Sequence, residues 1–438
     1  MLKLFTLYYQ ANKFRIRSLS AEGGWVFVGQ IAGITGSLVL VRVLTEYLNP
    51  EQYGQLALGL TLAGLVNQTI SGGITAGIGR YYSIAAEKQD LDSYLLATRY
   101  LLAYATLVVV VIAVILIGGL YWLGYTRWIC LAAAALVFSV LSGYNSALGS
   151  IHNAARQRAV VAFHGSLDAW LKILLTVVVM HVLGTSSTAV VIGYACSSLL
   201  ISVSQLFFMR RTIQYPEQYT ILVNHQRWMP KIWEYSLPFS TWGIFTWAQQ
   251  VSDRWALQAF VTSSDLGKYA VLFQLGYAPV ALITGMAMSF LGPILYQRSG
   301  DALDSDRNAS VHRMVWRLCQ FSVMVTLLCF VIALALHKHL FTLMVATEYR
   351  QSSWLLPWFV MAGGLFAAGQ MLTLKLMSEI NPAKMTIAKI TSALIGVLLN
   401  VFGAALAGVE GVVGALVAFS TIYFFWMMIL ARRLTVQI

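Results

Sequence analysis

Residues 236–269 read SLPFSTWGIFTWAQQVSDRWALQAFVTSSDLGKY. This stretch indicates that the chain crosses a membrane and that it contains a repeated pattern. Its part 237–260 is long and apolar enough to cross a bilayer whose hydrocarbon core is about 30 Å thick. At helical spacing, however, it places Trp242, Gln249 and Asp253 on one face. Because a charged group facing lipid costs several kcal/mol, this face is predicted to line a protein interior or a wet cavity.

The same pattern occurs earlier in the chain. Residues 42–58, RVLTEYLNPEQYGQLAL, and residues 254–272, RWALQAFVTSSDLGKYAVL, both begin with an arginine at the end of a span. In both, a short polar loop follows, and then a glycine opens the next span. Weak self-similarity of this kind is typical of transporters built from two repeats.

The composition identifies a polytopic membrane protein. Of 438 residues, 58% are hydrophobic and only 11% are charged, with a mean hydropathy of +0.71. A basic, aromatic leader at residues 1–20 precedes the first apolar run, so no cleavable signal is expected, and the leader is predicted to lie along the membrane surface. The net charge of +12 resides mainly in short loops, where it sets topology and meets anionic lipid heads, so nucleic-acid binding is not expected.

Apolar segments predict an all-α protein with twelve transmembrane helices. The segments are residues 22–43, 55–80, 97–120, 128–150, 165–183, 189–209, 236–260, 267–297, 317–337, 353–376, 388–408 and 412–431.

The loops predict the topology. Most of the 29 Lys and Arg residues fall on the side that holds both termini, which places both termini in the cytoplasm. The longest connection, residues 210–235, separates a six-helix lobe at 1–209 from a second at 236–438. Because six is even, the lobes enter the membrane in the same direction, and a pseudo-twofold axis relating them would run along the membrane normal.

A charged pair is predicted inside the first lobe. Asp168 and Lys172 are four residues apart and can pair on one helical face. Two interpretations remain open: a neutralised structural pair, or a functional group that acts either as a cation for an anionic substrate or as a titrating switch. Arginines near span ends, in contrast, can reach lipid phosphates by extending to the interface.

The glycine-rich segment 72–82, GGITAGIGRYY, superficially resembles a phosphate-binding loop. No strand precedes it and no GK[ST] follows, so close helix packing through Gly73 and Gly77 is predicted instead. Gln68 and its polar neighbours Thr61 and Thr75 add a hydrophilic stripe to this span, which supports a wet interior.

Catalytic and metal-binding patterns are sparse. The seven histidines and four cysteines show no metal-ligand spacing beside carboxylates, so no metal, cofactor or catalytic residue is expected. Glu46 and Glu51 in the first outer loop could serve a lipid-dependent glycosyltransferase or polymerase, which needs an acidic base facing outward. The outer loops are too short for the domain that such enzymes use to hold their substrates.

Four segments together resemble bacterial polysaccharide flippases, the polysaccharide transporter branch of the multidrug/oligosaccharidyl-lipid/polysaccharide exporter superfamily. They are GGITAGIGRYYSIAAEKQD (72–90), LTEYLNPEQYGQLAL (44–58), VSDRWALQAFVTSSDLGKYAVL (251–272) and LLNVFGAALAGVEGVVGALVA (398–418). With the length and the twelve-span pattern, the likeness covers nearly the whole chain.

The resemblance implies a V-shaped bundle of two six-helix lobes that opens alternately to each side. It implies translocation of undecaprenyl-diphosphate-linked oligosaccharide repeat units from the cytoplasmic to the periplasmic leaflet of the bacterial inner membrane, for O-antigen, lipopolysaccharide, capsule or exopolysaccharide synthesis. It implies a transporter and not an enzyme. The expected partners are the lipid-linked substrate, membrane lipids, and the polymerase and chain-length machinery of the same pathway.

Family members often have a cationic central cavity, which gives specific residues to test. The cationic candidates in this sequence are Arg42, Arg80, Lys172, Arg254 and Lys375. The polar and aromatic lining is predicted to include Gln68, Trp242, Trp247, Gln249 and Gln250, which offer hydrogen bonds and stacking surfaces to sugars. Asp168 and Asp253 are the candidates for ion coupling, and they keep a cation-coupled multidrug exporter of the same superfamily open as the alternative function.

Overall fold

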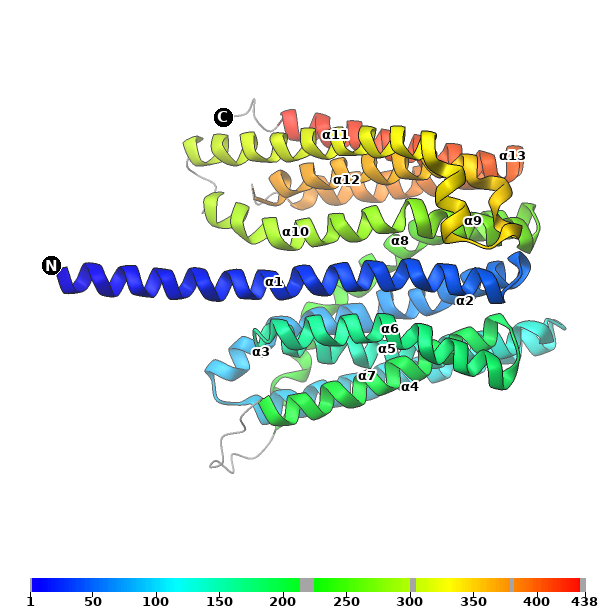
Figure 1. Cartoon of the computed structure of the whole chain (residues 1–438). Coiled ribbons are helices and arrows are strands. Elements are labelled where there is room, and N and C mark those ends of the chain that lie inside the picture. Colours follow the sequence, from blue (N-terminus) through cyan, green and yellow to red (C-terminus); the bar gives the residue numbers. More distant parts are fainter. Residues whose placement is uncertain (1, 213–223, 300–304, 379–381, 434–438) are drawn as a thin grey trace. The chain divides into compact units, whose positions relative to one another are not determined.

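The computed structural model describes residues 2–212, 224–299, 305–378 and 382–433 (Figure 1). Every regular element in these ranges is helical. The α-helices are α1 (Leu2–Tyr47), α2 (Pro50–Val66), α3 (Gly72–Glu87), α4 (Leu91–Trp122), α5 (Ile129–Ala154), α6 (Arg158–Leu183), α7 (Ser187–Thr212), α8 (Met229–Phe260), α9 (Ser263–Gly276), α10 (Ala278–Ser299), α11 (Ser305–Met344), α12 (Leu356–Ser378) and α13 (Pro382–Arg433). The short elements are the π-helix η1 (Asn67–Ser71) and the 3-10 helices η2 (Thr126–Trp128), η3 (His225–Arg227) and η4 (Thr347–Leu355).

Nine helical stretches within the described ranges are long and apolar enough to cross a membrane. The predicted all-helical, multi-pass class is therefore confirmed, whereas the number of twelve spans stays a prediction. Three predicted spans account for the difference: the stretch 236–260 in α8 is not among the nine, and the other two have local causes. The predicted span 55–80 is divided into α2, η1 and α3. The predicted spans 388–408 and 412–431 are joined in α13, whose backbone breaks at Ala407 and Gly408, and Gly408 has a positive φ of 54° that favours glycine.

The chain forms two compact units, and each is built from two separate parts of the sequence. Unit 1 comprises Met1–Ser37 and Leu62–Ile244, and unit 2 comprises Leu38–Thr61 and Phe245–Ile438. The chain passes from one unit to the other inside α1, α2 and α8. The lobes predicted at 1–209 and 236–438 stay a prediction. Of the predicted linker 210–235, residues 213–223 lie outside the described part, and α8 begins within its last part, at Met229.

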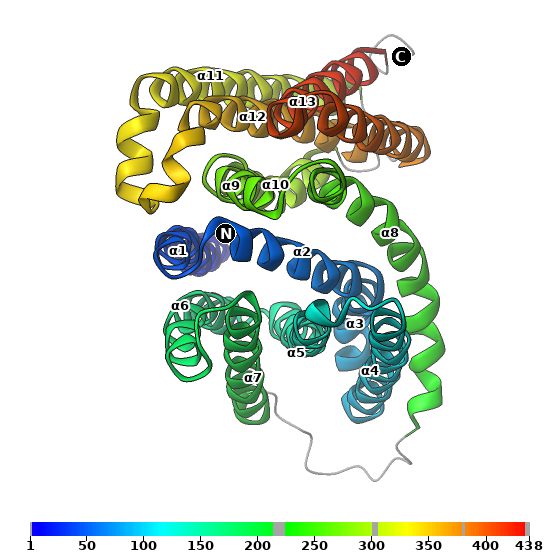
Figure 2. The same cartoon turned by 90° about the vertical axis from the view of Figure 1, so that its right-hand side faces the viewer.

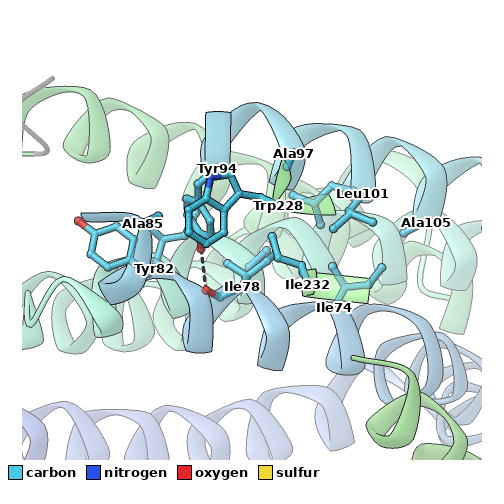
Figure 3. Packing of buried hydrophobic residues seen from close by; sticks show 13 residues of the cluster. Ile74, Ile78, Tyr82, Ala85, Tyr94, Ala97, Leu101, Ala105, Trp228 and Ile232 are labelled. Atoms are coloured by element: carbon cyan, nitrogen blue, oxygen red, sulfur yellow. Dashed lines mark hydrogen bonds between the residues drawn. The ribbon is translucent and has the colours of Figure 1, made fainter. Parts of the chain in front are cut away.

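The core of unit 1 packs α3, α4 and α5 against the first turns of α8. Tyr94 is buried there, and its hydroxyl donates a 2.6 Å hydrogen bond to the carbonyl oxygen of Ile78 (Figure 3). Trp228 lies beside Tyr94, and its indole Nε1 donates to Oδ2 of Asp90 at 2.8 Å. A buried indole or phenol thus keeps its polar atom bonded while its ring fills the core.

Glycines permit the close approach of α3 to α8 in unit 1. A Cβ at Gly73 would lie 2.9 Å from the carbonyl oxygen of Ser236, and one at Gly77 would lie 2.7 Å from that of Ile232. No side chain fits at these distances. The packing role predicted for Gly73 and Gly77 is confirmed.

In unit 2, α12 lies between α11 and α13 and also packs against α9 and α10 (Figure 2). Residues 38–61 complete this unit: the Tyr349 hydroxyl donates to the carbonyl oxygen of Leu48 at 2.7 Å. Helices α2 and α9 cross at Gly54 and Gly267, where a Cβ on Gly267 would overlap the carbonyl oxygen of Pro50.

Candidate functional site

The predicted pair of Asp168 and Lys172 forms on α6. Lys172 Nζ donates to Asp168 Oδ2 at 2.6 Å, with side-chain exposures of 24% and 20%. The second carboxylate oxygen accepts a 2.9 Å hydrogen bond from the hydroxyl of Ser197 on α7. The carboxylate is therefore satisfied from two helices, which accounts for a charged pair within an apolar span.

Two aromatic rings lie near the ammonium of Lys172. Its Nζ lies 5.8 Å from the ring centre of Phe138 on α5 and 5.9 Å from that of Tyr194 on α7. Thr176 lies one turn further along α6, buried, with no hydrogen-bond partner for its Oγ1 among the described residues. Helices α5, α6 and α7 thus place an ion-paired ammonium beside two aromatic rings, an arrangement that favours a cation.

Asp253 is the buried carboxylate of unit 2. It is 3% exposed, and its Oδ2 accepts a 2.6 Å hydrogen bond from the hydroxyl of Tyr269 on α9. Its Oδ1 accepts from the backbone N–H of Arg254 at 2.7 Å. The carboxylate thus obtains donors from α8 and α9, as burial of such a group requires.

The remaining cationic candidates have different surroundings. Arg254 is half-buried, and its guanidinium lies 4.9 Å from the ring centre of Phe273. Arg42 forms an ion pair with Glu46 one turn along α1. Arg80 is exposed at the surface of unit 1.

Lys375 is buried inside unit 2, between α12 and the end of α13. Its Nζ donates a 2.5 Å hydrogen bond to the carbonyl oxygen of Ala431. An ammonium at the last turn of a helix satisfies free carbonyls and complements the helix dipole. This contact shows how unit 2 accommodates a buried cation next to α13.

Two tryptophans converge on Thr61 in unit 2. Trp247 Nε1 donates to the carbonyl oxygen of Thr61 at 2.8 Å, and Trp255 Nε1 donates to its hydroxyl at 3.0 Å. The sequence indicated Trp247 but missed Trp255, which lies eight residues further along the same helix. Gln249 is half-buried and Gln250 is exposed.

Sequence-based prediction also did not identify two polar side chains that form hydrogen bonds between helices. Asn400 on α13 donates through Nδ2 to the Ser252 hydroxyl at 2.9 Å, and this hydroxyl donates to the Gln249 carbonyl oxygen at 3.1 Å. In unit 1, Asn67 in η1 exchanges hydrogen bonds of 2.9 and 3.2 Å with Ser142 on α5. An asparagine within an apolar run was the available signal in both cases.

The predicted site residues divide between the two units. Unit 1 contains Gln68, Arg80, Trp242, Asp168 and Lys172, and the side chain of Trp242 lies outside the described part. Unit 2 contains Arg42, Trp247, Gln249, Gln250, Asp253, Arg254 and Lys375. Among the side chains that the structure describes, no three His, Cys, Asp or Glu residues form a group that could hold a metal ion.

Residues 19–298, more than half of the chain, match the family model described as "Polysaccharide biosynthesis protein". The chain belongs to this polysaccharide biosynthesis protein family. The match includes both carboxylates described above and the ring-enclosed Lys172. No curated protein sequence matches the chain.

Solved structures show the fold of this family member to be that of membrane transporters. The lipid II flippase MurJ in an inward closed conformation is 11% identical in sequence, with a TM-score of 0.68. The match covers 94% of this chain and 87% of the MurJ chain. An inward-facing multidrug resistance MATE transporter of the MOP superfamily is 14% identical in sequence, with a TM-score of 0.64. The match covers 93% of this chain and 98% of that transporter. The MATE transporter VcmN from Vibrio cholerae, in its bent form, is 14% identical in sequence, with a TM-score of 0.52. The match covers 92% of this chain and 98% of VcmN. With the apolar helices, this likeness establishes a multi-pass membrane protein of the polysaccharide biosynthesis family.

Proposed function

We propose that the chain is a flippase that moves undecaprenyl-diphosphate-linked oligosaccharide repeat units from the cytoplasmic to the periplasmic leaflet of the bacterial inner membrane. It would act by alternating access, with twelve spans in two lobes and both termini in the cytoplasm, and serve O-antigen, capsule or exopolysaccharide synthesis. The observation that carries this proposal is the family match over residues 19–298. The fold shared with a lipid II flippase supports it, because that protein also acts on a lipid-linked substrate.

The surroundings of Lys172 suit the head group of such a substrate. A diphosphate needs cationic donors, and a sugar ring packs on aromatic faces. Lys172 supplies the ammonium, and Phe138 and Tyr194 supply the rings. In the proposed step, a substrate phosphate displaces Asp168 as the partner of the ammonium, and Ser197 continues to donate to the released carboxylate.

The direction of transport agrees with the membrane potential. An anionic head group moving outward runs with an inside-negative potential, which contributes about 2.3 kcal/mol per charge per 100 mV. The lipid tail can remain in the bilayer throughout, so only the head group needs a hydrophilic route. Arg42, Arg80, Arg254 and Lys375 are proposed as further cations along this route, with Gln68, Trp242, Trp247, Gln249 and Gln250 as its polar and aromatic lining.

The test is a complementation experiment in a deletion strain. Lys172→Ala and Arg254→Ala, alone and together, are expected to lower surface polysaccharide and to cause the lipid-linked intermediate to accumulate, at unchanged protein levels. Lys172→Arg should restore part of the activity because it keeps the positive charge. Lys338→Ala is the matched control, since Lys338 is an exposed cation of α11. Normal polysaccharide in the double variant would refute the assignment of these cations.

A cation-coupled multidrug exporter is the second candidate, and the buried carboxylate of Asp253 together with the MATE-like fold favours it. Such a protein binds a proton or sodium ion at an acidic group inside the fold. Deletion would then lower drug tolerance and leave surface polysaccharide intact. For the flippase, lipid flipping in proteoliposomes that responds to neither pH nor sodium gradients would remove Asp168 and Asp253 as coupling sites.

A further inference from the structure

A hollow of about 360 Å³ opens on unit 2 between the first half of α11 and the last turn of α13. It is lined by His312, Trp316, Gln320 and Arg432. The three α11 residues are spaced four apart and so form one stripe on the helix, which Arg432 faces from α13. None of these side chains belongs to the cationic or carboxylate groups described above.

The described residues that line the hollow supply hydrogen-bond donors and an aromatic face, and none of them is a carboxylate. The guanidinium of Arg432 lies 5.4 Å from the ring centre of Trp316. Neither Arg432 nor Gln320 has a hydrogen-bond or ion-pair partner among the described residues. A guanidinium without such a partner keeps its N–H donors available, and these match phosphate oxygens in geometry and charge.

His312 contributes a further donor. Its Nδ1 is buried and has no hydrogen-bond partner among the residues that the structure describes. A buried N–H without an acceptor is rarer than an unpaired acceptor, so the neutral ring is assigned the tautomer with its proton on Nε2. Nε2–H is then the polar group that this ring offers to a ligand.

Positive charges lie near the hollow. Arg313 and Arg317 are exposed on the adjacent stripe of α11, and the buried ammonium of Lys375 acts electrostatically on His312. Clustered positive charge raises the local concentration of anions and makes their binding dependent on salt.

We propose that this hollow binds a phosphoryl group, held by Arg432, His312 Nε2 and Gln320, with the group that carries it packed on Trp316. Since the C-terminus is predicted to be cytoplasmic, the phosphoryl group would come from a lipid head of the cytoplasmic leaflet or from phosphate free in the cytoplasm. The site is independent of transport through Lys172 and would anchor or regulate the protein.

The test is native mass spectrometry of the purified full chain in detergent with phosphatidylglycerol, or with diacylglycerol of the same chains, which lacks the phosphoryl group. Phosphatidylglycerol should bind in preference, and Arg432→Gln should weaken this binding about 10- to 100-fold, as expected for a lost charge-assisted hydrogen bond. Trp316→Leu should also weaken it, and Trp316→Phe should do so less. Arg127→Gln is the matched control, because Arg127 also lies 5.4 Å from a tryptophan ring, that of Trp128.

The outcomes separate the two sources of the ligand. Displacement of phosphatidylglycerol by millimolar inorganic phosphate identifies the phosphoryl group alone as the ligand, whereas resistance to it identifies the lipid head. Lys172→Ala should bind phosphatidylglycerol as the unmodified chain does, whether or not it transports. Equal binding of diacylglycerol, or equal effects of Arg432→Gln and Arg127→Gln in variants with unchanged melting temperature, would overturn the proposal.

Discussion

The hydroxyl of Tyr269 donates a 2.6 Å hydrogen bond to Oδ2 of Asp253, and both residues are buried in unit 2. The bond connects α8 to α9 across the loop that separates them. A carboxylate without access to water depends on such donors. Removal of the Tyr269 hydroxyl is therefore expected to lower the free energy of unfolding.

Tyr269→Phe is expected to destabilise the protein by about 1 to 3 kcal/mol, because it leaves a buried carboxylate oxygen without its donor. Thermal unfolding in detergent measures the change. Tyr423→Phe is the matched control: the hydroxyl of Tyr423 is buried with no partner among the described residues, so its removal should cost nothing or stabilise. Equal losses in the two variants would show that the hydrogen bond to Asp253 adds no stability of its own.

The Asp168–Lys172 pair predicts a characteristic double-mutant result. Lys172→Gln should destabilise by about 1 to 3 kcal/mol, since it leaves Asp168 without its charged partner. Adding Asp168→Asn should restore most of this stability, because two neutral amides can bond to each other. If transport stays low in the stable double variant, the charge itself acts on substrate. Recovery of both properties would mean that the pair serves only the structure.

Gly267→Ala should be strongly destabilising, because its methyl group would overlap the carbonyl oxygen of Pro50 where α2 and α9 cross. Overpacking of this kind costs about 1 to 3 kcal/mol, or more where backbone must move. Gly414→Ala in α13 has open space around it and should be neutral or stabilising by up to about 1 kcal/mol. The yield of monodisperse protein in detergent compares the two, and similar yields would contradict the close crossing.

Thr61→Val should release the indole of Trp255 and leave that of Trp247 bound, since only Trp255 donates to the Thr61 hydroxyl. The expected loss is about 0.5 to 1.5 kcal/mol, and Thr61→Ser, which keeps the hydroxyl, should show little change. Unfolding by guanidinium compares the three proteins. A valine variant as stable as the unmodified protein would contradict a stabilising role for this hydrogen bond.

Hydropathy and short-range spacing predicted a large part of this structure. An i,i+4 pair on one helix is a local geometry, so Asp168 and Lys172 could be paired from the sequence alone. The same holds for Gly73 and Gly77, whose spacing marks a helix-packing face.

The partners from other helices could not be predicted. Ser197, Tyr269 and Asn400 reach their partners through packing between helices, and hydropathy carries no information about which helices meet. The π-helix η1 was also missed, because its widened turn depends on tertiary contacts such as that of Asn67 with Ser142.

The division of unit 2 between Leu38–Thr61 and Phe245–Ile438 has a consequence for biosynthesis. The hydrogen bond from Tyr349 to Leu48 joins residues that are 301 positions apart, so it cannot form until most of the nascent chain has left the ribosome. The segment Leu38–Thr61 must therefore remain in the membrane without its unit 2 partners until they have been translated. A gene fragment that encodes only Phe245–Ile438 would lack the Leu38–Thr61 part of unit 2, and co-expression of an N-terminal fragment that contains it should restore folding.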